Sequence, residues 1–179
     1  KNVVLSKKYR TKATVRNLNN HIGVPLTLLS FTGETEIGIV EMGANHKKEI
    51  EFLCEIAQPD YGYITNFGKA HLEGFGGVEG VIEGKSEMYQ YLAKNDKLAF
   101  VNLEDPIQIE KSAGIQSFTF GVNNDKADVK IQNIAANPFV VIEYENFNVE
   151  SHLIGLYNSN NINAAVSIGR YFKVDDKAV

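Results

Sequence analysis

Two histidines stand shortly after two apolar segments, and each has a residue with side-chain oxygen nearby. The stretch EMGANH, from Glu41 to His46, follows the first apolar segment. The stretch NFGKAHLEGFGG, which begins at Asn66 and contains His71 and Glu73, follows the second. Carboxylate oxygen and imidazole nitrogen together can coordinate a divalent cation. These two stretches are therefore the first candidates for a site that performs chemistry.

The two apolar segments predict the scaffold that positions these residues. The run from Ile37 to Met42 is nearly continuously apolar, which is typical of a strand covered on both faces, and residues 61–67 form another short apolar run. In an open parallel sheet, ligands bind beyond the carboxyl ends of the strands. We therefore expect both loops to meet over one crevice. The side chains that this arrangement would bring within reach of one another are Glu41, His46, His71, Glu73 and Lys85.

The candidate ligands favour magnesium over zinc. A Mg²⁺ ion usually takes one or two protein ligands and completes its shell with water and phosphate oxygen. A structural zinc site typically has four protein ligands. Sparse ligands on two separate loops therefore fit Mg²⁺ better. For any one of these histidines alone, the alternative is a surface or helix-capping role.

Glycine spacing offers a competing interpretation. Gly74, Gly76 and Gly80 form a loose relative of the dinucleotide-binding fingerprint, which would indicate a nicotinamide-dependent oxidoreductase. That fingerprint should lie in the first tight turn after a strand, yet seven residues lead from Phe67 to Gly74. The glycines are better explained by a loop that folds closely over a ligand, or by a turn.

A phosphate-binding loop of the form G-x-x-x-x-G-K-[ST] is absent from the 179 residues. The stretch EGKS ends like that motif, but Glu79 occupies the position where the first glycine is required. It also lies within a predicted helix, so we reject it as a phosphate loop.

The remaining pattern predicts an α/β fold with a mostly parallel central sheet flanked by helices. Predicted strands at 97–102 and 117–121 continue the sheet, and residues 77–94 are helical in their second half. From Asp128 to Gly155, alternating β-branched and aromatic residues predict a small antiparallel addition, with turns near 137–138 and 145–146. Residues 158–174 predict a final helix with an Asn or Ser cap.

Composition excludes several classes of protein. Hydrophobic residues make up 44% of the chain, which is enough for a core, and no apolar run approaches the roughly 20 residues of a membrane span. The net charge is −4, and basic residues gather only in the first sixteen positions, so nucleic-acid binding is not expected. The single cysteine, Cys54, fits a reducing compartment, and we expect a cytoplasmic location. We interpret Cys54 as a buried apolar residue and not as a nucleophile.

Several stretches taken together resemble one known family. NLNNHIGVPLTLL, EMGANH, NFGKAHLEGFGGVEGV and GKSEMY occur in this order, and GLYNSNNINAA follows near the end. They resemble the central, ATP-binding domain of the Mur ligases, whose fold is related to that of the P-loop nucleoside triphosphatases. The match is most specific between Thr14 and Gly80.

The resemblance implies an ATP-dependent amide ligase of peptidoglycan synthesis. Its substrates would be UDP-N-acetylmuramoyl-tripeptide and D-alanyl-D-alanine, joined through an acyl phosphate, with ATP and Mg²⁺ as cofactors. Related ligases of the folylpolyglutamate or cyanophycin type remain an alternative, as does a non-catalytic binding module that kept the fold.

The resemblance also implies roles for individual residues. Glu41 and His71 would be the Mg²⁺ ligands, and Lys85 matches a lysine that many members carry as a carbamate; a solvated helix lysine is the alternative. Asn19 and Asn20, together with His46, would contact the UDP-linked substrate, although a turn before the next helix would equally explain the two asparagines. The residues that would face adenine or ribose are Tyr157, Asn158 and Asn161, with helix capping as the alternative for Asn158.

The chain departs from the family pattern in its extent. The family's phosphate loop and its lysine should precede the segment KNVVLSKKYR, and they do not occur in residues 1–179. Tyr157 stands where the family usually has histidine, and Ser86 where glycine is common. We therefore expect one partial central domain, without the N-terminal UDP-binding domain and the C-terminal domain, and we expect this polypeptide alone to be inactive.

Overall fold

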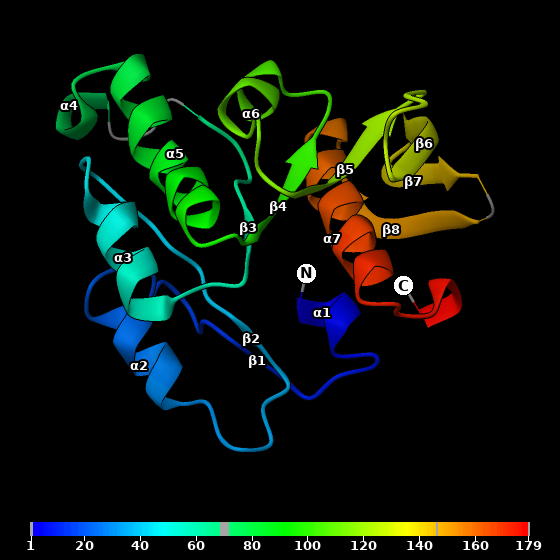
Figure 1. Cartoon of the computed structure of the whole chain (residues 1–179). Helices are drawn as coiled ribbons and strands as arrows, with labels where there is room; N and C mark the ends of the chain where they lie inside the picture. Colours follow the sequence, from blue (N-terminus) through cyan, green and yellow to red (C-terminus); the bar gives the residue numbers. More distant parts are fainter. Residues whose placement is uncertain (1, 69–71, 146, 179) are drawn as a thin grey trace.

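The computed structural model describes residues 2–68, 72–145 and 147–178 (Figure 1). Its strands are β1 (Thr11–Ala13), β2 (Ile37–Ile39), β3 (Tyr61–Tyr63), β4 (Leu98–Asn102), β5 (Ser117–Val122), β6 (Val129–Ala136), β7 (Phe139–Tyr144) and β8 (Asn148–Ile154). Its α-helices are α1 (Asn2–Leu5), α2 (Gly23–Leu29), α3 (Glu49–Ala57), α4 (Leu72–Phe75), α5 (Val78–Lys94), α6 (Pro106–Lys111) and α7 (Ser159–Tyr171). Two short 3₁₀ helices, η1 (Leu156–Asn158) and η2 (Asp176–Ala178), flank α7.

The described strands form two sheets. β1 and β2 pair in parallel in a small sheet of their own. The larger sheet has the order β3-β4-β5-β6-β7-β8, and it is parallel from β3 to β6 and antiparallel from β6 to β8. The expected α/β fold with an antiparallel addition is confirmed, and the addition continues the same sheet through the β5–β6 pair. The turn expected near 137–138 coincides with a cis peptide bond between Asn137 and Pro138, and the turn expected at 145–146 reaches outside the described residues.

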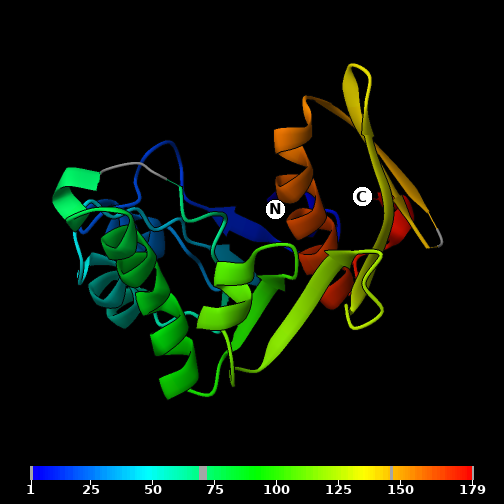
Figure 2. The ribbon, with the colours of Figure 1, turned by 90° about the horizontal axis from the view of Figure 1, so that it is seen from above.

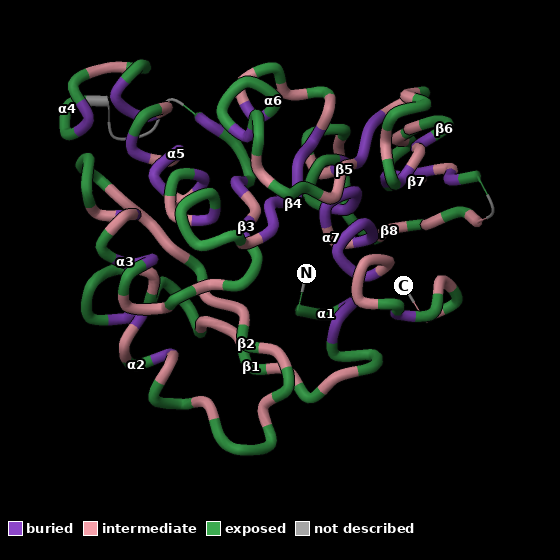
Figure 3. The backbone as a smooth tube through the Cα atoms, viewed as in Figure 1, coloured by how far each residue is buried: buried purple, intermediate pink, exposed green. Residues whose placement is uncertain are grey.

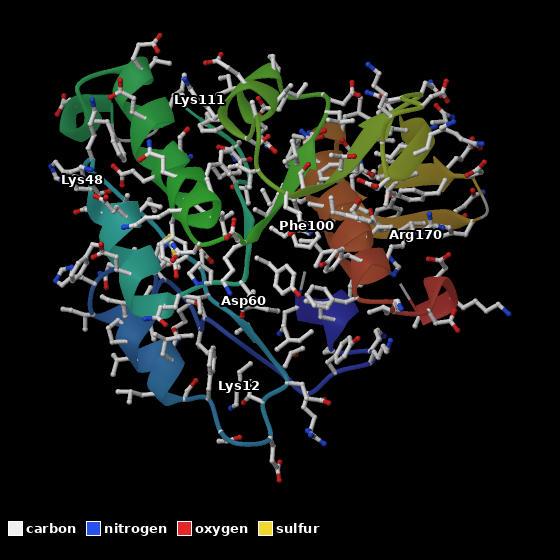
Figure 4. All side chains as sticks on the ribbon, viewed as in Figure 1. Lys12, Lys48, Asp60, Phe100, Lys111 and Arg170 are labelled. Carbon is white, nitrogen blue, oxygen red and sulfur yellow. The ribbon has the colours of Figure 1, made fainter. Side chains whose placement is uncertain are left out.

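Helices lie on both faces of the parallel part of the larger sheet, around β4 (Figure 2). β4 is buried along its whole length because its side chains alternate between two apolar clusters. Leu98 and Phe100 pack with residues of α1 and α7, whereas Ala99 and Val101 pack with residues of α5. Figure 4 shows Phe100 near the centre of the molecule, between β4 and α1. Figure 3 shows the buried residues gathered along β4, β5 and α7.

Three elements differ from the sequence expectation. β2 ends at Ile39, because the chain from Val40 onward leaves the ladder and forms the loop that leads to α3. β3 ends at Tyr63, also earlier than expected. Helix α5 includes the glycine-rich first half of 77–94, since Gly80 and Gly84 let it approach Phe75: a Cβ on Gly80 would lie 1.8 Å from the Phe75 carbonyl oxygen. Tertiary packing here outweighs the low helix propensity of glycine.

Candidate functional site

One cavity of about 1310 Å³ is lined by residues of both sheets, and its lining continues past the carboxyl ends of β2 and β3. Near these strand ends it is lined by polar side chains from four different segments. They are Asn19 and Asn20 before α2, Glu41 after β2, Asn66 after β3 and Lys85 of α5. The expectation that the loops after these two apolar segments share one crevice is therefore confirmed for the described residues. The two strands are not hydrogen-bonded neighbours, however, since each belongs to a different sheet.

Glu41 is held in place through β1 and the loop before α2. Its backbone N–H donates to the Thr14 hydroxyl at 2.9 Å, and the Asn19 side-chain amide donates to its carboxylate at 3.3 Å. The Asn19 carbonyl in turn accepts from the Gly43 N–H at 2.8 Å. The carboxylate is exposed on its remaining side and can accept further ligands.

Asn20 has a structural contact. Its side-chain oxygen accepts from the backbone N–H groups of Ile22 and Gly23, at 3.1 and 2.9 Å, and so stabilises the turn that leads into α2. Pro25 lies in the first turn of that helix, where its missing N–H costs nothing. Asn20 lines the cavity while it performs this role.

Lys85 lies half-buried on α5 and reaches the loop after β3. Its ammonium group donates to the Asn66 carbonyl at 2.7 Å. Burial lowers the pKa of Lys85 below its ordinary value, because desolvation disfavours the charged form. Lys85 therefore becomes a neutral amine at lower pH than a solvated lysine does.

His46 lies apart from this group. Its Nδ1 is 3.6 Å from a Glu49 carboxylate oxygen, and its backbone N–H donates to Glu49 at 3.1 Å. Glu49 also accepts from the Asn45 N–H at 2.6 Å, and this bond is the main cause of its lowered pKa. His46 does not line the cavity, and its ring faces the turn at Gly74, where a Cβ would lie 3.3 Å from Nε2. The expectation that His46 joins Glu41 and Lys85 is thus not met in this structure.

The other expected residues fall in two groups. His71 lies outside the described residues, and Glu73, on α4, is exposed and does not line the cavity. The second group lies at the start of α7, near the end of the sheet toward which the arrow of β4 points (Figure 1); it consists of Tyr157, Asn158 and Asn161. The Tyr157 side chain is 79% exposed and Asn161 is exposed, so both are available to a ligand.

The expected side-chain cap of α7 is wrong. Asn158 occupies the N-cap position, but its amide donates backwards to the Ile154 carbonyl at 2.9 Å. The Ser159 hydroxyl likewise donates to the Leu156 carbonyl at 2.7 Å. Both side chains therefore stabilise the 3₁₀ turn before α7, and the first backbone N–H groups of α7 receive no side-chain cap from them.

Sequence reasoning missed Glu87, which connects α5 with the loop after β2. Its carboxylate is buried and accepts from the backbone N–H groups of Lys48 and Glu51, at 2.6 and 3.0 Å. One turn earlier on α5, Glu83 forms a close ion pair with Lys47. α5 thus holds both Lys85 and the start of α3. The available signal was a carboxylate among the apolar residues of a predicted helix.

Gln108 of α6 is a second residue that the sequence analysis missed. It is 1% exposed; its amide donates to the Ile64 carbonyl at 3.0 Å, and its oxygen accepts from the Asn102 N–H at 3.0 Å. It ties the end of β4 to the segment after β3. The sequence signal for its helix was Asp105-Pro106, a cap followed by proline at the first helical position, and Asp105 does cap α6.

The donors of this site fit a sparsely ligated cation. Among the described residues, no group of three or more histidine, cysteine or acidic side chains is placed to surround a metal ion. Glu36, Glu49 and Asp60 also line the cavity, but they bind Arg10, the Asn45 N–H and Lys97. Glu41 is bonded to the Asn19 amide and is exposed on its remaining side, which suits Mg²⁺ with mostly water and phosphate ligands. A closed zinc site does not fit this donor set.

The glycines of the loose dinucleotide pattern have a packing role in the described structure. A Cβ on Gly74 would lie 2.3 Å from the Asn45 carbonyl oxygen, and a Cβ on Gly80 would lie 1.8 Å from the Phe75 carbonyl oxygen. Gly76 adopts a φ of +76°, which favours glycine in the turn before α5. The close backbone approach at these positions is made by the chain itself, so the nicotinamide interpretation loses its basis.

The fold and this site define a Mur-type ligase domain, and comparison with known proteins agrees. Residues 1–169 match the family model of the Mur ligase middle domain, so the chain belongs to that family. It is 34% identical over 176 residues to the UDP-N-acetylmuramoyl-tripeptide–D-alanyl-D-alanine ligase of Bacillus subtilis, covering 96% of this chain and 37% of that protein. The chain thus spans little more than a third of the length of this relative.

Solved structures give the same result. A crystal structure of MurF from Acinetobacter baumannii superposes with a TM-score of 0.86 at 30% identity, covering 99% of this chain and 40% of that one. The MurF ligase of Thermotoga maritima, solved in complex with ADP, gives a TM-score of 0.83 at 28% identity, covering 99% of this chain and 43% of that one. None of the described helices combines the length and hydropathy that crossing a bilayer requires.

Proposed function

We propose that this chain is the ATP-binding part of a ligase that joins D-alanyl-D-alanine to UDP-N-acetylmuramoyl-tripeptide. The relatives from several bacteria bear the name of that activity, and the chain shares 34% identity with one of them over nearly its whole length. The observation that carries the proposal is the meeting of Glu41, Asn66 and Lys85 at the mouth of one cavity. A carboxylate and an amine beyond the carboxyl ends of parallel strands support the proposal, because ligands bind there in open α/β sheets.

The reaction has two steps. A carboxylate oxygen of the tripeptide attacks the γ-phosphorus of ATP, the bond to the β-phosphate oxygen breaks, and ADP leaves. The amine of D-alanyl-D-alanine then attacks the carbonyl carbon of the acyl phosphate. The tetrahedral intermediate expels inorganic phosphate and the nitrogen loses a proton. Because anions meet in both steps, the site must supply positive charge.

Glu41 would hold Mg²⁺, and Asn19 would keep its carboxylate oriented through the 3.3 Å hydrogen bond. His71, which lies outside the described residues, would be the second protein ligand. When bound, Mg²⁺ would neutralise the phosphate oxygens. Asn19, Asn20 and His46 would contact the UDP-linked substrate, and Tyr157, Asn158 and Asn161 would face adenine or ribose. Since ATP and UDP-linked precursors are cytoplasmic, the protein would act in the cytoplasm.

Lys85 would act as a carbamate. The lowered pKa of this half-buried lysine favours the neutral amine, whose nitrogen can attack CO₂, form a C–N bond and release a proton. The product is an anion, which could support the cation held by Glu41. The ammonium form would instead repel that cation.

The remainder of the ligase would come from polypeptide outside the 179 residues. That polypeptide would supply the phosphate loop, a UDP-binding domain and a C-terminal domain for the amine substrate. A longer protein containing this chain tests the proposal: it should release phosphate from ATP only when both D-alanyl-D-alanine and UDP-N-acetylmuramoyl-tripeptide are present. Release with a folyl or glutamyl substrate instead would assign the chain to another amide ligase.

The role of Glu41 is tested in the same protein. Glu41→Gln keeps the shape and the hydrogen-bond acceptor but removes the charge. We expect a loss of turnover that added Mg²⁺ partly restores, while the matched variant Glu73→Gln on α4 retains activity. Normal turnover and normal Mg²⁺ dependence in Glu41→Gln would remove this residue from the metal site.

A further inference from the structure

The hydrogen-bond ladder between β3 and β4 stops before β4 itself ends. β3 pairs with β4 only as far as Tyr63 and Phe100. On its other edge, β4 stays paired with β5 through Asn102, and the Leu103 N–H still donates to the Phe120 carbonyl at 2.8 Å. The interruption therefore lies on the β3 side alone and does not reflect a frayed end of β4.

A side-chain amide occupies the place of the next hydrogen bond in this ladder. The Leu98 N–H donates to the Asp60 carbonyl at 3.3 Å. Because the bonds along one edge of a parallel strand recur every two residues, this register sets the Asn102 N–H opposite the Ile64 carbonyl. Instead, the Asn102 N–H donates to Gln108 Oε1 at 3.0 Å, and Gln108 Nε2 donates to the Ile64 carbonyl at 3.0 Å. Gln108 thus lies between the two strands at the point where they would otherwise bond to each other.

Both ends of this amide are held firmly. Besides the Ile64 carbonyl, Nε2 also faces the Asp105 carboxylate at 3.3 Å, and Asp105 accepts from the backbone N–H groups of Ile107 and Gln108. The side chains of Ile64, Asn102 and Gln108 are all buried, so a backbone group left unpaired here would be costly. The insertion of the amide is therefore fixed by the first turn of α6.

The inserted amide lies close to the candidate site along the chain. Ile64 is two residues before Asn66, whose carbonyl accepts from the Lys85 ammonium group at 2.7 Å. Ile64, Asn66 and Lys85 all line the cavity, whereas Gln108 does not. Gln108 thus holds the loop after β3 from the side of the sheet, and Lys85 meets the same loop from α5.

We propose that Gln108 is a positioning residue for Lys85. By ending the ladder between β3 and β4 one hydrogen bond early, it directs the loop after β3 toward α5 and keeps the Asn66 carbonyl against the Lys85 side chain. The expected effect on turnover rests on the proposed ligase function. The placement of Lys85 itself can be tested without any ligase activity.

Two substitutions at this position test the proposal. Gln108→Met keeps about the same length but lacks both hydrogen bonds, and Gln108→Ala removes the side chain, so that the Asn102 N–H can bond the Ile64 carbonyl directly. In both variants we expect the loop after β3 to move away from Lys85 and water to reach the amine. Because desolvation is the cause of its lowered pKa, the acylation midpoint of Lys85 should rise toward that of Lys48.

The measurement uses a longer protein that contains this chain, in buffer free of CO₂, so that Lys85 is present as the amine. Acylation over a pH series, followed by mass spectrometry of the peptides, gives the midpoints of Lys85 and Lys48 in one sample. Val129→Ala is the matched control, because Val129 is as buried as Gln108, at 1% exposed, but belongs to the apolar cluster of β5, β6, β7 and α7. This control should lower stability and leave both midpoints unchanged.

Turnover supplies a second measurement in the same protein. We expect the kcat per folded molecule to fall between about tenfold and a hundredfold in both Gln108 variants, the effect of a displaced group at a reacting site. The KM for ATP should change little, and Val129→Ala should keep a normal kcat per folded molecule.

Two results would overturn the proposal. An unchanged Lys85 midpoint in whichever Gln108 variant folds would show that the loop keeps its place without this amide. An equal rise of that midpoint in Val129→Ala would show that a general loosening of the structure exposes the amine. Absence of ligase turnover in the unaltered protein would instead contradict the proposed function, and the midpoints would still decide the role of Gln108.

Discussion

Lys85, on α5, and Lys48, at the start of α3, lie in different environments. Lys85 is half-buried, and its pKa is lowered by desolvation. Lys48, at the start of α3 (Figure 4), has a raised pKa because it bonds to and is attracted by Glu51. The two amines of one chain therefore provide an internal comparison.

We predict that Lys85 becomes reactive at lower pH than Lys48. Acylation of the folded chain over a pH series, followed by mass spectrometry of the peptides, gives the titration midpoint of each amine. Between the lowered pKa and 10.5, the unfolded state holds a proton that folded Lys85 has released, so this residue's contribution to stability rises with pH in that window. A midpoint for Lys85 at or above that of Lys48 would contradict the prediction.

Burial has the opposite effect on the reactivity of Cys54, because it disfavours the reactive thiolate form. It is fully buried in α3, and desolvation, aided by the charge of Glu87, raises the pKa of its thiol to about 12. We predict that a maleimide at neutral pH labels it only after denaturation, because the thiolate is the reactive form. Equal labelling rates in the folded and denatured chain would show that α3 does not cover the thiol.

At the scale of elements, α5 organises the loop after β2. Glu87 satisfies two backbone N–H groups at the start of α3, a position without a side-chain cap of its own. Glu87→Ala should lower the free energy of unfolding by about 1–3 kcal/mol, since the N–H groups of Lys48 and Glu51 lose a buried acceptor. Chemical denaturation measures this change.

The matched control is Glu83→Ala on the same helix. Glu83 is exposed and bonds a lysine side chain, so its removal should have a much smaller effect on stability. Similar losses in both variants would mean that the cost arises from helix α5 itself and not from the start of α3.

The elements also show what the sequence could predict. The sequence predicts the strand at Leu98–Asn102 because a short, continuous apolar run is typical of a strand buried on both faces. This pattern can be read without knowing the neighbouring strands. The sequence predicts that the loop after β2 brings His46 within reach of Glu41, but in the structure His46 lies beside Glu49 and the turn at Gly74. The contact with Gly74 joins residues distant in sequence, and no local pattern encodes it. α5 was underestimated for the same reason, since Phe75 fills the space left by its glycines.

The same limit applies to the site. Glu41, Lys85 and Asn19 were identified through position and resemblance, and the cavity brings them together. Glu87 and Gln108 were missed because their function lies in accepting and donating to backbone groups of other elements. A buried polar residue can be recognised in the sequence only when the buried face of its helix is already known.

For the whole molecule, we predict that the 179-residue chain does not turn over ATP with UDP-N-acetylmuramoyl-tripeptide and D-alanyl-D-alanine. It contains no G-x-x-x-x-G-K-[ST] loop, whose backbone N–H groups would cradle the β- and γ-phosphates. Phosphate release is the measurement, and the longer protein is the positive control. Turnover by the chain at the rate of that control would contradict the prediction.

The three-residue ladder between β1 and β2 has a consequence for how the molecule opens. Among the described residues, neither strand of that ladder is hydrogen-bonded to a strand of the larger sheet, whereas β6 and β7 share a longer ladder and, together with β5, one apolar cluster with α7. Fluctuations that open the short ladder break few backbone hydrogen bonds, so they need not disturb the larger sheet. The amide hydrogens of Thr11–Ala13 should then exchange through frequent local opening, whereas those of Phe120 and Ile142 should exchange only through global unfolding.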